Sequence, residues 1–469
     1  MRTGPIRNGC HTRGAGQSSK VLFRPKVDTI DLGGASASAS GLRIFHAPRS
    51  AGVMKPKLLT IIQDYSAKLF VADALAGVTV AMVALPLSIA IAIASGAEPA
   101  AGLVTAIIGG FLISALGGSR VQIGGPTGAF IVVVYGVIEQ FGFDGLLLAT
   151  LMAGVILIIA ALARAGRLIA LIPEAVIEGF TIGIALIIAI SQLKDLFGLS
   201  IARLPADFID AVPALWDARH SANLTAALIG LASIAAIALL RRRAGLIIVI
   251  ALASATVALL ALPVETIHSR FGSLPNGLPF PALPSITLAR MSELLPSAFV
   301  IAFLAGIESL LSAIVADRMV GGSHRSNAEL LAQGAANIAS PLFGGLPATG
   351  AIARTAANVR AGGRTPVAGM VHALAILIFV VAAAPLAGYL AMPALAALLL
   401  VTAWSMSEPH RWREHLRARP ADRFLLFLTM TLTVLSDLTV AIAVGVAVGL
   451  AQRLIRRDVD PAEWTPPDR

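Results

Sequence analysis

Long blocks of apolar residues, separated by short polar or Gly/Pro-rich stretches, dominate the pattern of this chain. Residues 71–95 contain one charged residue, Asp73, and residues 145–163 and 244–263 contain none. Each block is near or above the ~18 residues that indicate a transmembrane helix. A helix on the core of a soluble protein would instead carry polar residues along one face. The pattern therefore predicts an all-α, polytopic integral membrane protein.

Fourteen hydrophobic segments follow from this pattern. The third, ninth and tenth are too short and too rich in Gly and Pro to cross ~30 Å of hydrocarbon alone. Ser326 and Glu329 stand at capping-box spacing, which supports a helix start at the ninth. The expected segments are residues 71–95, 99–117, 126–138, 145–163, 172–193, 222–240, 244–263, 293–316, 326–339, 347–358, 366–388, 390–404, 422–436 and 438–455.

The distribution of basic residues orients these segments. If the N-terminus is cytoplasmic, fifteen arginines lie on the cytoplasmic connections. Five basic residues lie on the other side, all in two long loops: Lys194, Arg203, Arg219, Arg270 and Arg290. Cytoplasmic loops carry the excess of Lys and Arg. The asymmetry predicts a multi-pass protein of the inner (plasma) membrane with both termini in the cytoplasm.

Composition adds little that the pattern does not already require. Apolar residues make up 57% of the chain and charged residues 13%, against about 25% charged in a soluble domain. The net charge of +10 is explained by the cytoplasmic arginines, so no nucleic-acid partner is expected. The single cysteine, Cys10, allows no disulfide framework, and the eight histidines show no metal-ligand spacing.

The N-terminal stretch differs from the rest of the chain in composition. Residues 1–53 are rich in Gly, Ser and Arg and have no apolar core, which is typical of disorder rather than of a signal peptide. We expect either that Met54 is the true start or that these residues are a genuine disordered tail. The predicted divisions are a disordered, basic segment 1–63, a first repeat 64–263, an extracytoplasmic loop 264–292, a second repeat 293–455 and a short cytoplasmic tail 456–469.

Two related motifs indicate internal symmetry. GGPTGAF at residues 124–130 opens the third segment, and GGLPATGAIAR at residues 344–354 opens the tenth. In both, a proline (Pro126 or Pro347) precedes Thr-Gly-Ala at the start of a short helix. Seven segments separate the motifs, and seven is odd, so the second half must be inverted relative to the first. Inverted repeats with broken helices at matching positions point to a transporter's midplane site.

A half-helix that begins inside a membrane is a natural anion site. Its first four N–H groups have no partner and no water. The helix dipole adds about half a positive charge at the same end. The alternative for each motif is a Gly/Pro kink at a helix contact, which two matched copies disfavour. The residues expected to line the site are Pro126, Thr127, Gly128, Ala129, Thr349, Gly350 and Ala351.

Two charged residues complete this picture. Arg354 lies two turns into the tenth segment, where a buried arginine is a functional hypothesis by default. Its alternative is a side chain that snorkels to the cytoplasmic face. Glu308 lies in the middle of the eighth span, where it can carry a proton or help to hold sodium. The alternative is a structural hydrogen bond, with Ser309 and Ser312 as nearby partners.

The other polar residues of the spans have more ordinary interpretations. Glu174 and Glu178, four residues apart at the start of the fifth span, are read as charges at the membrane interface. Asp73 and Asp437 are read as interfacial or N-terminal residues. His372, in the eleventh segment, is read as a packed, hydrogen-bonded histidine rather than a proton relay.

At these residues the sequence resembles the sulfate permease (SulP) family of anion transporters. The resemblance covers residues 64–455 and rests on three stretches. They are DALAGVTVAMVALPLSIAIA at 73–92, GGSRVQIGGPTGAF at 117–130, and the run of residues 306–366 that contains HRSNAELLAQGAANIASPLFGG.

The resemblance implies a fold of fourteen segments in two inverted repeats, shared with uracil permeases and divided into a core and a gate domain. It places the substrate between the third and tenth half-helices and the first span. It assigns substrate binding to Arg354 and proton or sodium coupling to Glu308. It also implies alternating access by movement of the core against the gate, in a homodimer.

Three positions near the expected substrate depart from the family pattern. Pro86 is followed by Leu87 where many relatives have Gln, and Ile91 stands where an aromatic residue is usual. Ser88 is the hydroxyl that remains in this part of the first span, and Ala353 replaces the serine before the arginine. The expected pocket is less polar. The C-terminal STAS domain of relatives is also expected to be missing.

The expected function is secondary active transport of a small anion: sulfate, bicarbonate or a dicarboxylate. Coupling to protons or sodium is expected, with no other cofactor and no metal apart from sodium near Glu308. The alternative is an uncoupled channel or exchanger of the same fold. A nucleobase carrier fits the fold, but Arg354 favours an anion. A membrane enzyme is not expected, because no metal set, nucleophile elbow or phosphate loop occurs in the chain.

Overall fold

The structure is a computed structural model that describes residues 54–167, 173–201, 204–205, 207–240, 245–436 and 438–455. These residues form a helical assembly with one short pair of strands, β1 (Gly124–Gly125) and β2 (Thr349–Gly350). The helices are α1 (Leu58–Ile61), α2 (Ala67–Ala94), α3 (Pro99–Val104), α4 (Gly110–Leu116), α5 (Ile131–Leu162), α6 (Glu174–Ser191), α7 (Leu193–Leu196), α8 (Phe208–Asp217), α9 (Leu224–Leu239), α10 (Gly245–Leu259), α11 (Ile267–Phe271), α12 (Leu288–Val320), α13 (Ser326–Leu342), α14 (Ile352–Ala361), α15 (Val367–Gly388), α16 (Met392–Met406), α17 (Trp412–Arg417), α18 (Pro420–Leu435) and α19 (Leu438–Ile455).

Within the described residues, six helical stretches are long and apolar enough to cross a membrane. They are Ala67–Ala94, Pro99–Leu116, Gly128–Leu162, Glu174–Leu196, Leu288–Val320 and Val367–Gly388. A seventh results if Phe208–Ser221 and Leu224–Leu239, bent by 118°, form one span. Helix α13 has 17 residues and α14 has 10. Neither is among the six, in keeping with the short ninth and tenth segments expected from the sequence.

The predicted third and fourth segments form one continuous helical stretch. A 3-10 turn, Gly128–Phe130, leads directly into α5, which runs to Leu162. The break expected between residues 138 and 145 is present as a kink at Gly142, with φ 72° and ψ 176°. A left-handed φ of this kind costs little only for glycine. The kink therefore replaces the loop that the sequence predicts.

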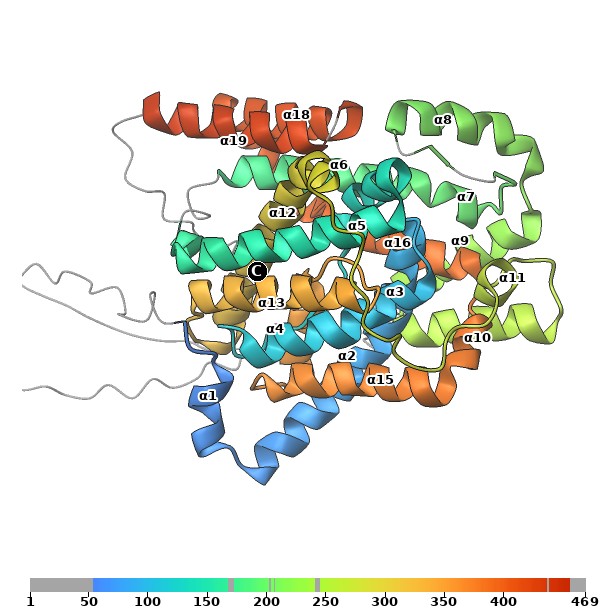
Figure 1. The fold of residues 1–469 in the computed structure, drawn as a ribbon. Helices are drawn as coiled ribbons and strands as arrows, with labels where there is room; N and C mark the ends of the chain where they lie inside the picture. The colour runs from blue at the N-terminus through green and yellow to red at the C-terminus, as the bar shows by residue number, and fades with distance from the viewer. Residues whose placement is uncertain are drawn as a thin grey trace, which may run out of the picture. The chain divides into compact units, whose positions relative to one another are not determined.

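A first group of helices packs around α5 and α13. Figure 1 shows α5, α13, α4 and α15 running side by side, and α2 packs against α15. Helices α12 and α14 complete this group. Helices α5 and α13 approach closely at Gly154 and Gly334, where a Cβ on either residue would meet the other's carbonyl oxygen at 2.8 Å. Small residues at such contacts let helix backbones approach closely in membranes.

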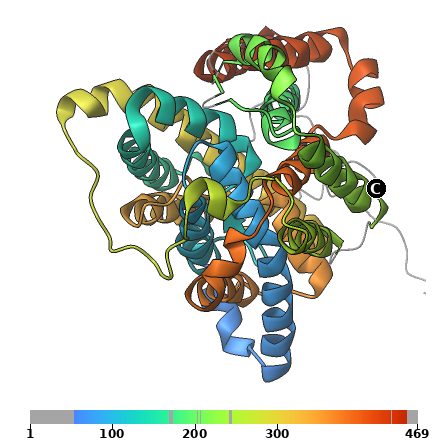
Figure 2. The same ribbon diagram turned by 90° about the vertical axis from the view of Figure 1, so that its right-hand side faces the viewer.

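A second group contains α6, α7, α9, α10, α16, α18 and α19. Helix α6 packs along α18 through Gly179 and Gly183, which lie against Leu426 and Thr433. Helix α16 contacts α6, α7 and α9 within this group and also α2 of the first group. In Figure 2 the red helices near the C-terminus lie above the blue helix α2. The strand pair β1–β2 belongs to the first group, close to where the groups meet.

Several predicted boundaries are corrected by the structure. Helix α12 begins at Leu288, so it includes the end of the predicted extracytoplasmic loop 264–292, which also contains α11. Part of the predicted N-terminal segment 1–63 is helical at α1. Residues 1–53 with Cys10, the tail 456–469 and Asp437 lie outside the described residues, as do Arg203 and Arg241 to Arg243.

Candidate functional site

The segments 124–130 and 344–354, each with a proline before Thr-Gly-Ala, meet in space although more than two hundred residues separate them. Gly124 pairs with Gly350 and Gly125 pairs with Thr349 in the antiparallel strands β1 and β2. The N–H of Ala351 extends the pairing by donating to the carbonyl of Ile123 at 2.9 Å. Backbone groups buried in a membrane must be paired within the protein. The strand pair satisfies them while it holds two helix starts side by side.

Neither helix start is capped by its own N-cap side chain. Thr127 is the N-cap of the 3-10 turn that opens α5, and it makes no side-chain cap. Ala351 is the N-cap of α14 and has no group that could make one. The leading N–H groups at Gly128, Ala129 and Ile352 are therefore left without a side-chain cap, which is the condition for anion binding at a helix N-terminus.

Arg354 lies in the interior between these elements, with 3% of its surface exposed. Its Nη2 donates to Ser88 Oγ at 3.2 Å and to the carbonyl of Pro126 at 3.0 Å. Its Nε and Nη1 are buried and have no hydrogen-bond partner among the described residues. This burial does not fit the alternative of a side chain that snorkels to the cytoplasmic face. Gly125, with φ 151°, makes room for the guanidinium, because a Cβ there would collide with Nη1.

Glu308 faces the first helix start from α12. Thr127 Oγ1 donates to Glu308 Oε2 at 2.8 Å, and the Glu308 side chain is only half-buried. The alternative in which Glu308 bonds to Ser309 and Ser312 does not match the structure. Ser312 Oγ lies 3.2 Å from Thr355 Oγ1, and Ser309 turns to a different set of residues described below. Successive residues of a helix point about 100° apart, so Ser309 cannot share the face of Glu308.

The remaining predicted site residues divide into two kinds. Gly128 faces the second group of helices, since a Cβ there would meet Met406 Sδ of α16 at 3.0 Å. Ala129 and Ala351 are small, buried residues beside the helix starts. Thr349, by contrast, is fully buried and donates to the carbonyl of Ala305 at 3.0 Å. Gly350 leaves room for the side-chain amide of Gln122. These last two residues serve the packing beneath the strands.

Asp73 has a structural role that the sequence did not indicate. It was expected at the membrane interface, but it is fully buried. Its Oδ1 accepts from the N–H groups of Arg364 and Thr365 at 2.7 and 3.1 Å, and its Oδ2 accepts from Tyr65 Oη at 3.1 Å. Burial and then the charge of Asp73 raise the pKa of Tyr65 to about 12, so the phenol stays a donor. Asp73 therefore ties α2 to the start of α15.

A second buried carboxylate, Glu329, was also missed. The predicted capping box with Ser326 is wrong: Arg325 is the N-cap of α13, and Glu329 turns away from its own helix end. Gln333 and Asn337 follow it on the same face. A signal for this was present in the sequence, because polar residues four apart in an apolar helix form a stripe.

Other predicted polar residues lie away from the strand pair. Glu174 and Glu178 are not simple interfacial charges: Arg411 pairs with them at 3.0 and 2.8 Å. His415 Nδ1 lies 3.1 Å from Glu178 Oε2. His372 is fully buried, and neither ring nitrogen has a hydrogen-bond partner among the described residues. The expectation of a hydrogen-bonded histidine is therefore wrong.

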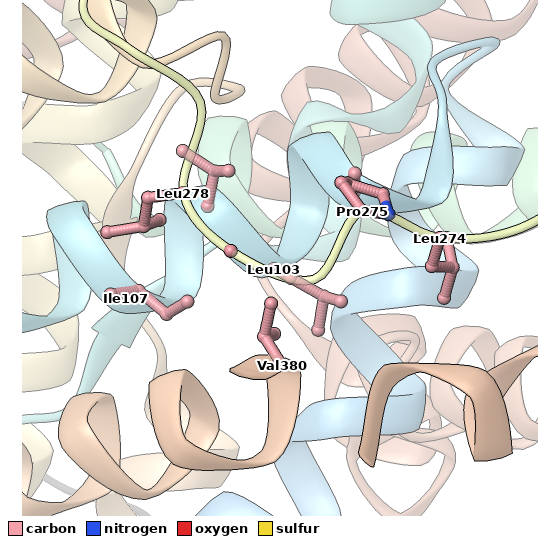
Figure 3. Close-up of a pocket in the computed structure, with 9 residues that line it drawn as sticks. Leu103, Ile107, Leu274, Pro275, Leu278 and Val380 are labelled. Atoms are coloured by element: carbon pink, nitrogen blue, oxygen red, sulfur yellow. The ribbon is translucent and has the colours of Figure 1, made fainter. Parts of the chain in front are cut away.

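The hollow shown in Figure 3 is a different kind of site. It lies where the loop after α11 crosses α3 and α15, and its volume is about 10 Å³. No polar side chain lines it, so it offers nothing to an anion. The labelled side chains of the hollow are Leu103, Ile107, Leu274, Pro275, Leu278 and Val380.

The described residues also contain no group of three or more His, Cys, Asp or Glu placed to hold a metal ion.

Comparison with known proteins places the chain among transporters. The model of the sulfate permease family matches residues 70–429. The chain is 43% identical to the putative sulfate transporter YvdB of Bacillus subtilis, over 81% of this chain and 73% of that protein. It is 32% identical to the bicarbonate transporter BicA of Picosynechococcus, over 79% of this chain and 68% of that protein.

Two solved structures resemble the fold. The transmembrane domain of a cyanobacterial bicarbonate transporter BicA matches with a TM-score of 0.71 and 28% identity, over 81% of this chain and 98% of that one. The structure of SLC26A9 matches with a TM-score of 0.78 over 86% of this chain and 68% of that one. At 18% identity the second match supports the fold alone. These matches confirm the resemblance noted from the motifs at residues 73–92 and 117–130.

Proposed function

The chain belongs to the sulfate permease family, and we propose that it is a secondary active transporter of a small anion. The observation that carries this proposal is Arg354. A guanidinium that is almost wholly buried keeps two nitrogens without a partner among the described residues. It lies next to two uncapped helix starts. An unpaired buried charge is costly, so a site of this kind is stabilised by an anion.

The anion contacts follow from this geometry. Arg354 Nε and Nη1 provide charge-assisted donors. The N–H groups that follow Thr127 and Ala351 provide the helix-end donors, and Ser88 provides a hydroxyl. Pro126 holds the arginine in place through its carbonyl. Thr349 and Gly350 hold the strand pair and act on the anion only through it.

The substrate is proposed as sulfate, bicarbonate or a small dicarboxylate. Relatives are named for sulfate and for bicarbonate. Leu87 and Ala353 offer no hydrogen-bonding side chain near Ser88 and Arg354. A pocket with few polar side chains suits an anion that needs few donors. Among the three candidates, this pocket therefore favours bicarbonate, or a singly charged form of another candidate, over fully ionised sulfate.

Glu308 is proposed as the coupling residue, for a proton or for sodium. It accepts a single hydrogen bond that the structure defines, from Thr127, so it has lone pairs left for a proton or a cation. The charges of Glu308 and Arg354 act on each other. A proton or sodium ion bound at Glu308 changes the electric field at Arg354, and this change links binding of the cation to binding of the anion.

The wider architecture is part of the same proposal. We assign the chain fourteen segments in two inverted repeats, with the first group of helices as the core and the second as the gate. Alternating access then moves the core against the gate at the contacts of Gly128 with α16. The transporter is proposed to be a homodimer in the inner membrane, with both termini in the cytoplasm.

The test is uptake into proteoliposomes containing the purified chain. Labelled sulfate, bicarbonate and succinate are supplied separately, with and without an inward proton or sodium gradient. The expected result is accumulation of at least one anion above its equilibrium level under one of the gradients. If none of the three anions enters faster than into protein-free vesicles, under either gradient, the proposal is wrong.

Glu308→Gln separates a coupled transporter from the alternative, an uncoupled channel or exchanger. The amide cannot take up a proton or supply a carboxylate to sodium. We expect the variant to lose gradient-driven accumulation while it still exchanges internal for external anion. Glu293→Gln, an exposed change near the start of α12, is the matched control and should accumulate normally. Equal gradient-driven accumulation in Glu308→Gln and wild type would remove Glu308 as the coupling residue. If neither protein accumulates anion under a gradient and both conduct it equally, the alternative is supported.

A further inference from the structure

One face of α13 carries a stripe of buried polar residues that the proposed transport reaction does not use. Glu329, Gln333 and Asn337 follow one another at every fourth position, and all three are fully buried. Residues four apart lie on the same side of a helix. In a membrane protein, buried polar residues are costly unless they are paired. Their partners show what the stripe does.

Glu329 holds the loop that leads into β1. Its Oε2 accepts from the N–H groups of Gly118 and Ser119 at 2.9 and 3.2 Å. Its Oε1 accepts from Ser309 Oγ at 2.9 Å and from Gln333 Nε2 at 3.1 Å. Four donors meet one carboxyl group, which is the pattern of an ionised carboxylate. Glu329 also lies in the first turn of α13, where the helix dipole favours negative charge.

Asn337 holds the residue that leads into β2. Its Oδ1 accepts from the N–H of Ala348 at 2.9 Å, and its Nδ2 donates to the carbonyl of the same residue at 2.8 Å. Ala348 directly precedes Thr349, the first residue of β2. The same helix face therefore fixes the entry to both strands, with Glu329 at one end and Asn337 at the other.

Gln122 connects this stripe to the strand pair itself. Its Nε2 donates to Ser309 Oγ at 2.9 Å and to the carbonyl of Ser309 at 3.2 Å. Its amide fills the space left by the missing side chain of Gly350 in β2. Ser309 is the neighbour of Glu308 in α12. The network thus connects Glu329 to Ser309, which is the residue next to Glu308. From Ser309 it continues through Gln122 to Gly350 of β2.

We propose that Glu329 is a positioning residue for anion transport. Its charge gathers Gly118, Ser119, Ser309 and Gln333 at one point and so sets the register of β1 against β2. That register determines how Arg354 and the two helix starts face the anion. The inference rests on the proposed function of the site, but it concerns a residue whose hydrogen-bond partners include none of the proposed ligands of the anion.

Two variants test this role. Glu329→Gln keeps the shape but directs an NH₂ group toward Ser309 and Gln333, which are themselves donors. We expect kcat/KM for sulfate or bicarbonate uptake to fall at least about tenfold, with KM raised, because a misplaced site binds more weakly. The double variant Glu329→Gln/Gln333→Glu moves the carboxylate one turn along α13. The amide at position 329 can then donate to the carboxylate at position 333, and so can the hydroxyl of Ser309. We therefore expect most of the uptake to return.

A readout independent of transport follows the strand register directly. Cys10 is the only cysteine in the chain, so Cys10→Ser gives a background for spin labels at Arg120→Cys and Arg360→Cys. The label at residue 120 reports the position of the loop before β1, and the label at residue 360 reports the position of the end of α14. The distance distribution should broaden in Glu329→Gln and narrow again in the double variant. Glu293→Gln is the matched control and should change neither uptake nor distance.

The outcomes separate this inference from the proposed function. Wild-type vesicles that take up no anion refute the proposed function but leave the spin-label distances to decide the role of Glu329. An unchanged distance distribution and unchanged KM in Glu329→Gln overturn the positioning role. A double variant that regains its thermal midpoint but not its KM also overturns it, because Glu329 would then serve folding alone.

Discussion

The two Thr-Gly-Ala segments, 124–130 and 344–354, look alike in sequence but contribute differently to the site. Thr127 of the first segment donates to the carboxylate of Glu308, whereas Thr349 of the second donates to the backbone carbonyl of Ala305. The second segment carries Arg354, three residues after Ala351. At the matching position, three residues after Ala129, the first segment has Val132.

This difference shows what the internal repeat preserves. In both copies an extended pair of residues is followed by a helix start without a side-chain cap: Gly124–Gly125 before Gly128, and Thr349–Gly350 before Ile352. The side chains divide the work between them. The second copy supplies the charge, and the first supplies the carbonyl of Pro126 that holds this charge and the hydroxyl that contacts Glu308. Symmetry of the backbone therefore does not predict symmetry of the chemistry.

Removing the charge tests the difference most severely. We expect Arg354→Ala to lower uptake at least about 30-fold, because truncating one member of a buried, charge-assisted pair costs about 2–5 kcal/mol and each 1.4 kcal/mol is about tenfold. Proteoliposome uptake measures the effect. Arg360→Ala, an exposed change in the last turn of the same helix, is the control and should transport normally. Folded Arg354→Ala protein with normal uptake would remove Arg354 from the site.

A smaller but still large effect is expected from the first segment at Gly125. Its φ of 151° is rarely adopted by residues with a side chain, and a Cβ would collide with Arg354 Nη1. Such strain costs about 1–3 kcal/mol. Gly125→Ala should therefore reduce uptake about tenfold or more by displacing the guanidinium, which an anion titration would report as a raised KM.

Gly136→Ala is the matched control for this change. Gly136 lies in α5, and a Cβ there would have nothing within 4 Å. Its uptake should equal that of wild type. If both glycine variants lose uptake equally, the loss reflects a general effect of added methyl groups in α5 and in the segment that leads into it. The close contact between Gly125 and Arg354 is then not the cause.

The sequence predicted the parts of this arrangement that depend on local pattern. The helix start near Gly128, the break near Gly142 and the buried position of Arg354 all follow from Gly, Pro and charge in apolar segments. The expected start of the tenth segment at residue 347 is wrong: α14 begins at Ile352, so Arg354 lies in its first turn rather than two turns in. The family resemblance followed from the same motifs. Ser88 and Pro126, expected near the anion, do lie beside Arg354.

The sequence could not predict which distant groups a polar residue meets. Asp73 bonds to Arg364 and Glu329 bonds to Gly118, at separations of 291 and 211 residues. Each was instead given a local role, at the interface or in a capping box, because spacing reveals only neighbours along one helix. The direction of the Thr349 hydroxyl was missed for the same reason: its acceptor belongs to another helix.

The smallest expected effect compares the two threonines directly. Thr127→Val and Thr349→Val each remove one hydroxyl donor at nearly constant volume, and a typical hydrogen bond contributes about 0.5–1.5 kcal/mol. Thr127→Val should reduce gradient-driven uptake by up to about tenfold and leave the thermal midpoint nearly unchanged, because the half-buried Glu308 can accept from water in place of the lost hydroxyl. Thr349→Val should lower the free energy of unfolding by about 1 kcal/mol and leave uptake per folded molecule within about twofold.

The crossed pattern is what makes this pair informative. Both measurements are made on both variants, so each threonine serves as the control for the other. If Thr349→Val impaired uptake as much as Thr127→Val at equal stability, the two segments would contact the anion symmetrically, and the division of work between them would be wrong. If only Thr127→Val changes transport, the asymmetry lies in where each hydroxyl points, since the two residues are otherwise the same threonine before the same Gly-Ala pair.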